Sequence, residues 1–251
     1  MTSWIVGDIH GCAEELALLL AELALGPGDR LVSCGDLFHR GPDPVGVMDL
    51  LAECRGAFVL GNHERRVLHR MGLAPGRSDG TDVPPRRATF PELDADVLAG
   101  DGGQPCNVPP ERRADVLRFL QTHAGYLLRG RDLPEAGPTR DGRDWLVVHA
   151  GILPDVPPEE SPVECLTSVR RLSGRGRPWW YEPYRGPELV FFGHTPSPVP
   201  RAHTAGGRLV ALGLDTGCVY GGRLTAYSPE LDEFAAIPAA RSYVPRPRAA
   251  G

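Results

Sequence analysis

The run Trp4-Ile5-Val6-Gly7-Asp8-Ile9-His10-Gly11 leads from apolar residues into an acid and an imidazole that are flanked by glycines. Four later stretches share this plan, because each follows or ends an apolar run and offers oxygen or imidazole groups. In α/β folds, ligands collect at the carboxyl ends of strands, and glycine lets the backbone approach them closely. We therefore predict that the polar side chains of all five stretches converge. The later stretches are Gly35-Asp36-Leu37-Phe38-His39-Arg40-Gly41, Gly61-Asn62-His63-Glu64, His149-Ala150-Gly151 and Gly193-His194.

The spacing of apolar residues predicts an α/β core in which strands and helices alternate. We expect one domain over residues 1–237 and a Pro- and Arg-rich, poorly ordered tail over 238–251. Residues 72–110 break the pattern and predict an irregular, cap-like insertion over the site, with a surface excursion of no function as the alternative. Strands are expected at residues 4–8, 30–34, 57–60, 145–148, 189–192, 209–214, 223–228 and 234–237, and helices at 12–25, 42–53, 64–71, 112–120 and within 163–172.

The composition limits the classes of function. The chain has 251 residues, is 41% hydrophobic and carries a net charge of −5, which supports a substantial core and argues against general nucleic-acid binding. It contains no lysine, which excludes a Schiff-base lysine and a Walker-type phosphate loop. No apolar run reaches membrane-spanning length, so we expect a cytoplasmic protein. The six cysteines form no Cys-x-x-Cys pair, and we interpret them as buried apolar residues.

The residue types in the five stretches favour a two-metal phosphoester hydrolase. Two divalent ions bring more charge than Asp8 and Asp36 neutralise, and the surplus complements a phosphate dianion and its transition state. Two such ions can clamp the phosphoryl oxygens and lower the pKa of a bridging water, whose hydroxide then attacks in line. Arg40 can hold phosphate oxygens, and His63 can donate a proton to the leaving oxygen. Mixed Asp, Asn and His ligands suit manganese, and also iron or zinc, rather than calcium.

These motifs resemble the calcineurin-like metallophosphoesterases, and among them the phosphoprotein phosphatase branch, whose pattern is GDxHG, GDxxDRG, GNHE, an HGG-like triplet and a later GH. The resemblance extends from Gly7 to about Ser228. The segment from Leu214 to Thr225 is similar to bacterial symmetrical diadenosine tetraphosphatases and their protein phosphatase relatives. The resemblance implies a four-layer α/β/β/α sandwich. It also implies that Asp8 and His10 bind one metal ion, that Asp36 bridges, that Asn62, His149 and His194 bind the other, that His63 is the general acid, and that Arg40 and Asn62 contact phosphate.

The sequence departs from that pattern in three places. His39 stands where the family has an Asp that pairs with the histidine of GNHE. Because an imidazole cannot favour the imidazolium as a carboxylate does, our hypothesis is that a smaller fraction of His63 is in its protonated, acid form near neutral pH. The triplet contains Ala150 in place of the family's glycine. No Arg follows the tryptophan before the last Gly-His, so Arg185 is the nearest candidate for a second phosphate-binding arginine, with Arg175 and Arg177 as others.

Three hypotheses for the function remain open. The leading one is a Ser/Thr-type protein phosphatase, the next is a symmetrical diadenosine polyphosphate hydrolase, and the third is a non-catalytic phosphate-binding module. The expected partner is a phosphorylated protein or nucleotide, without a membrane; the oligomeric state is not predicted. The aromatic run Trp179-Trp180-Tyr181 could stack on a base, but packing is the preferred interpretation. Arginine pairs such as Arg170-Arg171 are interpreted as solvated surface, and Glu64 as structural support.

Overall fold

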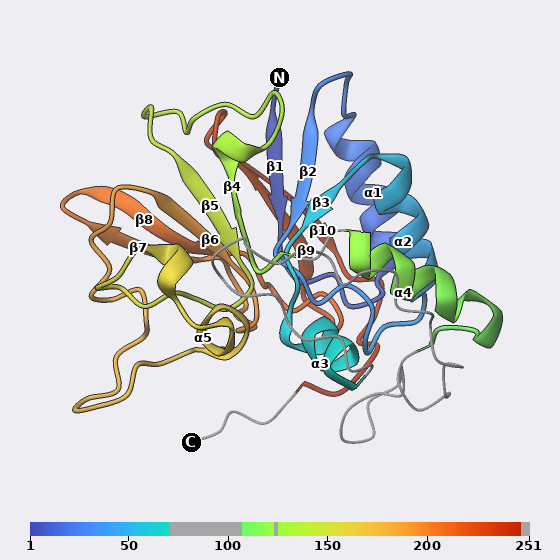
Figure 1. Ribbon diagram of the computed structural model, residues 1–251. Helices are drawn as coiled ribbons and strands as arrows, with labels where there is room; N and C mark the ends of the chain where they lie inside the picture. The colour runs from blue at the N-terminus through green and yellow to red at the C-terminus, as the bar shows by residue number, and fades with distance from the viewer. Residues whose placement is uncertain (71–106, 123–124, 247–251) are drawn as a thin grey trace.

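The computed structural model describes residues 1–70, 107–122 and 125–246, and in it two five-stranded sheets lie face to face (Figure 1). The predicted cap over residues 72–110 falls almost entirely outside the described residues. No described helix is both long and apolar enough to cross a membrane. The elements are β1 (Ser3–Val6), α1 (Ala13–Leu23), β2 (Arg30–Ser33), α2 (Pro44–Glu53), β3 (Ala57–Phe58), α3 (Asn62–Arg70), η2 (Pro110–Arg112), α4 (Arg113–Thr122), β4 (Leu127–Arg129), η3 (Gly130–Asp132), β5 (Trp145–Val148), η4 (Pro158–Glu160), α5 (Val163–Ser168), β6 (Leu189–Phe192), β7 (Arg201–Ala205), β8 (Arg208–Gly213), β9 (Arg223–Ser228) and β10 (Glu233–Pro238).

Each sheet has a parallel centre. The first has the order β10-β9-β1-β2-β3, in which β1, β2 and β3 are parallel and β9 and β10 are antiparallel. The second has the order β4-β5-β6-β8-β7, in which β5, β6 and β8 are parallel and β4 and β7 are antiparallel edges. The carboxyl ends of five of these parallel strands lead directly into the motif loops or the segment after Leu214.

Strand alternation explains how both faces of each sheet become buried. In β1, Ile5 packs between the two sheets while Trp4 and Val6 pack outward. In β6, Phe191 packs between the sheets and Phe192 packs outward. Strands covered on both faces are continuously apolar, and this is why the sequence shows short apolar runs rather than alternation.

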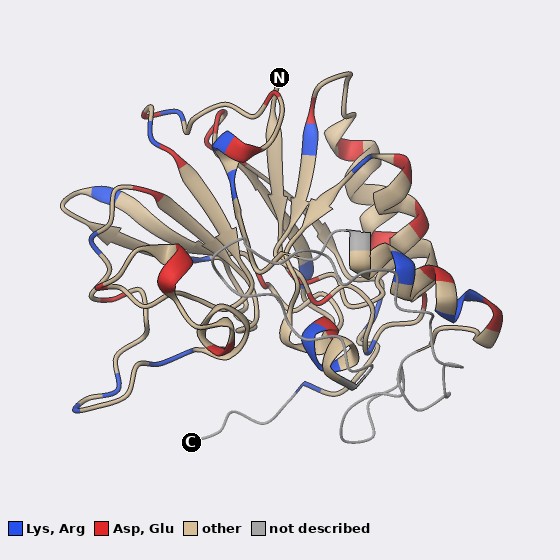
Figure 2. Ribbon diagram, viewed as in Figure 1, with Lys and Arg blue, Asp and Glu red and all other residues tan. Residues whose placement is uncertain are grey.

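The outer layers differ on the two sides. Helices α1, α2 and α4 cover the first sheet, and exposed acids on α1 and α2, such as Glu14 and Asp49, make that surface negative (Figure 2). The second sheet is covered mainly by the irregular segment 150–185, in which Trp180 and Tyr181 pack on Phe192. The predicted α/β sandwich is therefore confirmed, and α5 is the one α-helix described within that segment.

The sequence did not predict two edge strands, and part of the segment expected to be a poorly ordered tail packs on the domain. Strands β4 and β7 were not predicted, because β4 has three residues and β7 is only half-buried. Helix α5 occupies the first part of the predicted range 163–172 and ends at Ser168, because Val169 is extended. The first part of the predicted tail lies against the domain, where Ala239 N–H donates to the Gly222 carbonyl and Tyr243 N–H to that of Val219. Residues 247–251 lie outside the described part of the chain.

Candidate metal centre

The carboxyl ends of strands from both sheets meet at one place. Asp8 follows β1, Asp36 follows β2, His149 follows β5, and His194 follows β6, whereas Asn62 is the first residue of α3. Asp36 links the sheets, because its Oδ2 lies 3.5 Å from His149 Nε2. The predicted convergence of the motif side chains is thus what the structure shows.

The acids and imidazoles form two groups that share one residue. In the first group, the ligand-type atoms of Asp8, His10 and Asp36 lie within 4.8 Å of one another, and in the second those of Asp36, His149 and His194 do so. Asn62 belongs with the second group, since its Oδ1 lies 3.1 Å from His149 Nε2 and 3.0 Å from His194 Nδ1. A shared carboxylate between two groups is the arrangement that two adjacent ions require.

The tautomer of His149 shows that the second group suits a cation. Its Nδ1 lies 2.8 Å from the Cys34 carbonyl oxygen, which can only accept, so Nδ1 carries the proton. Burial lowers the pKa of His149, and in the neutral ring Nε2 then holds a bare lone pair. That lone pair faces the Asp36 carboxylate, which has no proton to donate in a hydrogen bond. Acceptors that face one another in a buried site are satisfied by a metal ion between them, with the Cys34 carbonyl orienting the ring from behind.

The first group also has excess negative charge. Burial raises the pKa of Asp8 well above its usual value, and the neighbouring carboxylates of Asp215 and Asp36 raise it further. The backbone N–H of His194 donates to both Asp8 oxygens, at 3.1 and 3.0 Å. Asp215, which follows β8, was not among the predicted site residues, although its segment carried part of the resemblance. Burial raises the pKa of Asp215 to about 6. A divalent cation would relieve this crowding of acids.

The motif backbone adopts conformations that tertiary contacts must enforce. His10, Asp36, Arg40 and His194 all have positive φ, between 50° and 82°, which non-glycine residues rarely adopt. A Cβ built on Gly193 would overlap Asp8 Oδ1. The glycine therefore lets the β6 loop approach the β1 loop, which places His194 beside Asp8.

Glu64 fixes the loop that carries Asp36. Its carboxylate accepts from the backbone N–H groups of Asp36, Leu37 and Gly61, at 2.9 to 3.0 Å. Burial, followed by the charge of Asp36, raises the pKa of Glu64 to about 7. This agrees with the interpretation of Glu64 as structural support.

His63 and His39 lie side by side without a carboxylate between them. Their ring centroids are 4.9 Å apart, and His63 Nε2 lies 3.9 Å from Asp36 Oδ2. Neither ring nitrogen of His63 has a hydrogen-bond partner among the described residues. Burial lowers the pKa of His63 to about 4, with Arg40 and Arg66 opposing the charged form and Asp36 favouring it. The direction agrees with the hypothesis that little of His63 is protonated near neutral pH.

Two arginines border the cluster, and only one of them was predicted. Arg40 Nη1 lies 2.6 Å from His10 Nε2, which makes it the positive group beside the first set of ligands. Arg170 Nη2 donates to the His194 carbonyl at 3.3 Å, so it borders the second set. Arg185 Nη1 donates instead to the carbonyls of Glu182 and Tyr184, at 2.7 Å each. Arg185 remains a prediction without a contact to the cluster, and Arg170 is the better-placed residue.

Trp179 does not offer a free face for a nucleotide base. The Arg171 guanidinium lies 4.2 Å from its ring centroid and that of Arg201 lies 4.4 Å away. Tyr181 also stacks on this ring, with the two centroids 6.0 Å apart and the ring planes 7° from parallel. Packing is therefore the better interpretation of Trp179, as the sequence suggested.

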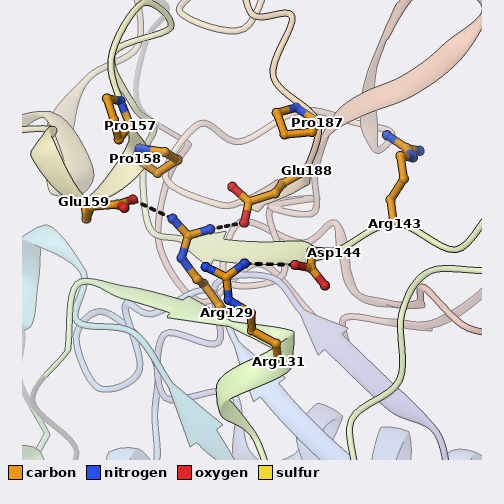
Figure 3. Close-up of a pocket in the computed structure, with 9 residues that line it drawn as sticks. All are labelled: Arg129, Arg131, Arg143, Asp144, Pro157, Pro158, Glu159, Pro187 and Glu188. Atoms are coloured by element: carbon orange, nitrogen blue, oxygen red, sulfur yellow. Dashed lines mark hydrogen bonds and ion pairs between the residues drawn. The ribbon is translucent and has the colours of Figure 1, made fainter.

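A pocket at the amino ends of β5 and β6, opposite the candidate metal centre, is built differently (Figure 3). Its residues Asp144 and Glu188 precede β5 and β6, whereas the candidate ligands follow these strands. Arg129 bonds Glu188 and Glu159, and Arg131 bonds Asp144, so acids and arginines here satisfy one another. We interpret this network as a structural clamp.

Comparison with known proteins agrees with this geometry. The model of the family described as calcineurin-like phosphoesterase matches residues 1–198. The chain belongs to the calcineurin-like phosphoesterases. It is therefore a metal-dependent phosphoester hydrolase of a family that uses a dinuclear metal centre, which disfavours the non-catalytic hypothesis.

Individual relatives span almost the whole chain. It is 30% identical to the bis(5'-nucleosyl)-tetraphosphatase PrpE [asymmetrical] of Anoxybacillus flavithermus, over 96% of this chain and 95% of that protein. A shorter match, 50% identical over 66 residues, joins it to the serine/threonine-protein phosphatase 1 of Salmonella typhimurium, and covers 26% of this chain and 31% of that protein. A crystal structure titled provisionally as a diadenosine tetraphosphatase has a TM-score of 0.66 and 27% identity, over 95% of this chain and 93% of that one.

Proposed function

We propose that this phosphoesterase hydrolyses the phosphoanhydride chain of dinucleoside tetraphosphates at a dinuclear centre. The observation that carries the proposal is the pair of ligand groups that share Asp36. The full-length similarity to a bis(5'-nucleosyl)-tetraphosphatase supports the choice of substrate. This reverses the order of the two catalytic hypotheses that the sequence alone suggested.

The chain's own residues divide the work as follows. Asp8, His10 and Asp36 would hold one ion, and Asp36, Asn62, His149 and His194 the other. Such ions, when bound, polarise phosphoryl oxygens and lower the pKa of nearby water. Manganese fits the mixed ligands, with iron or zinc as alternatives.

Positive side chains on both sides of the cluster suit a polyphosphate. The guanidinium of Arg40 borders the first ligand group and that of Arg170 borders the second. A planar guanidinium can bond two phosphate oxygens at once. A chain of four phosphates can contact both arginines while one phosphoryl group lies over the ligands between them.

The surroundings of His63 favour an anhydride over a serine ester. A departing serine alkoxide requires a proton, whereas a departing nucleotide phosphate is stable as an anion. Among the residues that the structure describes, none offers His63 a carboxylate within hydrogen-bond distance, and its neighbour is the His39 ring. A small protonated fraction of His63 limits serine-ester cleavage more than anhydride cleavage.

The second candidate is a Ser/Thr-type protein phosphatase. The specific observation that favours it is the 50% identical match over 66 residues to a serine/threonine-protein phosphatase. Both activities would use the same ligands, so substrate comparison distinguishes them.

The test compares diadenosine tetraphosphate with a phosphoserine peptide, both with manganese, and with Asp36→Asn as the inactive control. We expect kcat/KM for the nucleotide to exceed that for the peptide, and chromatography of the products gives the position of cleavage: ADP alone for symmetrical cleavage, ATP with AMP for asymmetrical cleavage. Rapid dephosphorylation of the peptide with an intact nucleotide would refute the proposal and support the second candidate.

A further inference from the structure

A second cluster of ligand-type side chains lies behind the first metal motif. Cys12 immediately precedes α1, Glu15 lies in its first turn, and Cys218 lies in the loop between β8 and β9. All three are buried, with exposed fractions of 0%, 1% and 2%. Their ligand-type atoms lie within 4.8 Å of one another. None of the three belongs to the ligand set proposed for the dinuclear centre.

Glu15 points to a missing partner in this cluster. Its Oε1 accepts from the backbone N–H of Ala240 at 2.9 Å and from the Tyr243 hydroxyl at 2.8 Å. Its Oε2 is buried and has no hydrogen-bond partner among the described residues. A buried carboxylate oxygen without a partner is costly, and such oxygens are usually satisfied by a donor or a cation.

We propose that Cys12, Glu15 and Cys218 bind a third divalent cation, of the zinc class. Thiolates and carboxylates are both zinc ligands, and paired thiolates select zinc over magnesium or calcium. Three protein ligands leave one position of a tetrahedron for a water molecule.

The bound ion would have a structural role. It joins the start of α1, next to Gly11 of the first motif, to the turn that contains Gly217. Through Glu15 it also joins the segment after β10, because Ala240 and Tyr243 both bond to that carboxylate. The site is enclosed, so the ion is acquired as the chain folds, and its binding adds to the stability of the fold.

The test uses cobalt, because thiolate ligands give Co²⁺ a near-ultraviolet charge-transfer absorption that Asp, Asn and His ligands do not give. The full chain is reduced, unfolded and refolded with Co²⁺, and its folding is checked by circular dichroism. We expect the wild type to show this absorption and to hold one more cobalt ion than the Cys12→Ser/Cys218→Ser variant. Cys165→Ser, which removes another buried cysteine, should retain both.

Measurements on the wild type and on Glu15→Gln keep the inference open to refutation if the double variant does not fold. Native mass spectrometry of the zinc-loaded chain should find three ions, and Glu15→Gln should lose one of them. Refolded wild type without the thiolate absorption would overturn the proposal, as would absorption that persists in a folded double variant. Neither readout depends on phosphoesterase activity, so the result is separate from that of the proposed function.

Discussion

Replacing His39 with Asp tests whether this position sets the pKa of His63 and therefore its protonated fraction. In the wild type, burial holds the pKa of His63 at about 4, so its imidazole is neutral at pH 7. Within the described part of the chain neither ring nitrogen of His63 has a hydrogen-bond partner, and the neighbouring ring of His39 brings no negative charge. A carboxylate at position 39 would favour the imidazolium and therefore raise the pKa.

The size of the effect follows from the separation of the rings. The centroids of His39 and His63 are 4.9 Å apart. A unit charge at about 5 Å contributes about 3 kcal/mol at an effective dielectric constant of about 20, which corresponds to about 2 pK units. The pKa of His63 would rise to about 6, and the imidazolium fraction at pH 7 from about one in a thousand to about one in ten.

The assay is the pH dependence of kcat with two substrates in the presence of manganese. For an alkyl phosphate or phosphoserine peptide, whose leaving group needs a proton, we expect the alkaline limb of His39→Asp to move up by about 2 pH units. For an aryl phosphate, whose leaving group is a stable anion, the profile should change much less. His39→Asn, which is polar but uncharged, is the matched control and should leave the limb in place.

Two outcomes would contradict this reasoning. The profiles of wild type and His39→Asp could coincide, in which case position 39 does not control the proton on His63. Alternatively, Asn and Asp could shift the limb equally, in which case the effect comes from removing the ring and not from adding charge.

Three further predictions concern other parts of the chain. Arg170→Ala should raise KM for a tetraphosphate about tenfold or more, because a charge-assisted hydrogen bond contributes about 1.5–3 kcal/mol, whereas Arg185→Ala should not; equal kinetics for both would count against Arg170. Gly193→Ala should reduce the bound metal, measured by elemental analysis, because the added methyl overlaps Asp8 Oδ1; full occupancy would disprove this. Arg129→Ala leaves the buried Glu188 unpaired and should cost about 3 kcal/mol, which lowers Tm by about 6–12 °C; an unchanged Tm would show that the clamp is dispensable.

Much of the site could be predicted because its information is local. Each motif places a polar residue directly after a short apolar strand, and the ends of parallel strands share an edge. Asp8 and Asp36 therefore converge once β1 and β2 pair. The glycines of the motifs are also visible in the sequence, although the contact that requires Gly193, its close approach to Asp8, is a tertiary one. The roles of these residues as metal ligands remain predictions.

Other features could not be read from the chain in this way. Arg170 belongs to an arginine pair that looks like solvated surface, and its position beside His194 depends on how segment 150–185 folds over the second sheet. Asp215 lies in a segment whose resemblance was noticed, but its charge matters only because β8 ends beside Asp8. Strands β4 and β7 are too short or too exposed to leave an apolar signature.

The sequence by itself determined the alternation of strands and helices and the identity of the side chains at the strand ends, because strand burial and motif chemistry are properties of neighbouring residues. Only the tertiary structure decided which distant groups share a volume. It placed Asp36 within reach of imidazoles from the other sheet, and Cys218 beside Cys12 and Glu15. The physical reason is that these contacts arise from the packing of two sheets and their loops, which no local spacing records.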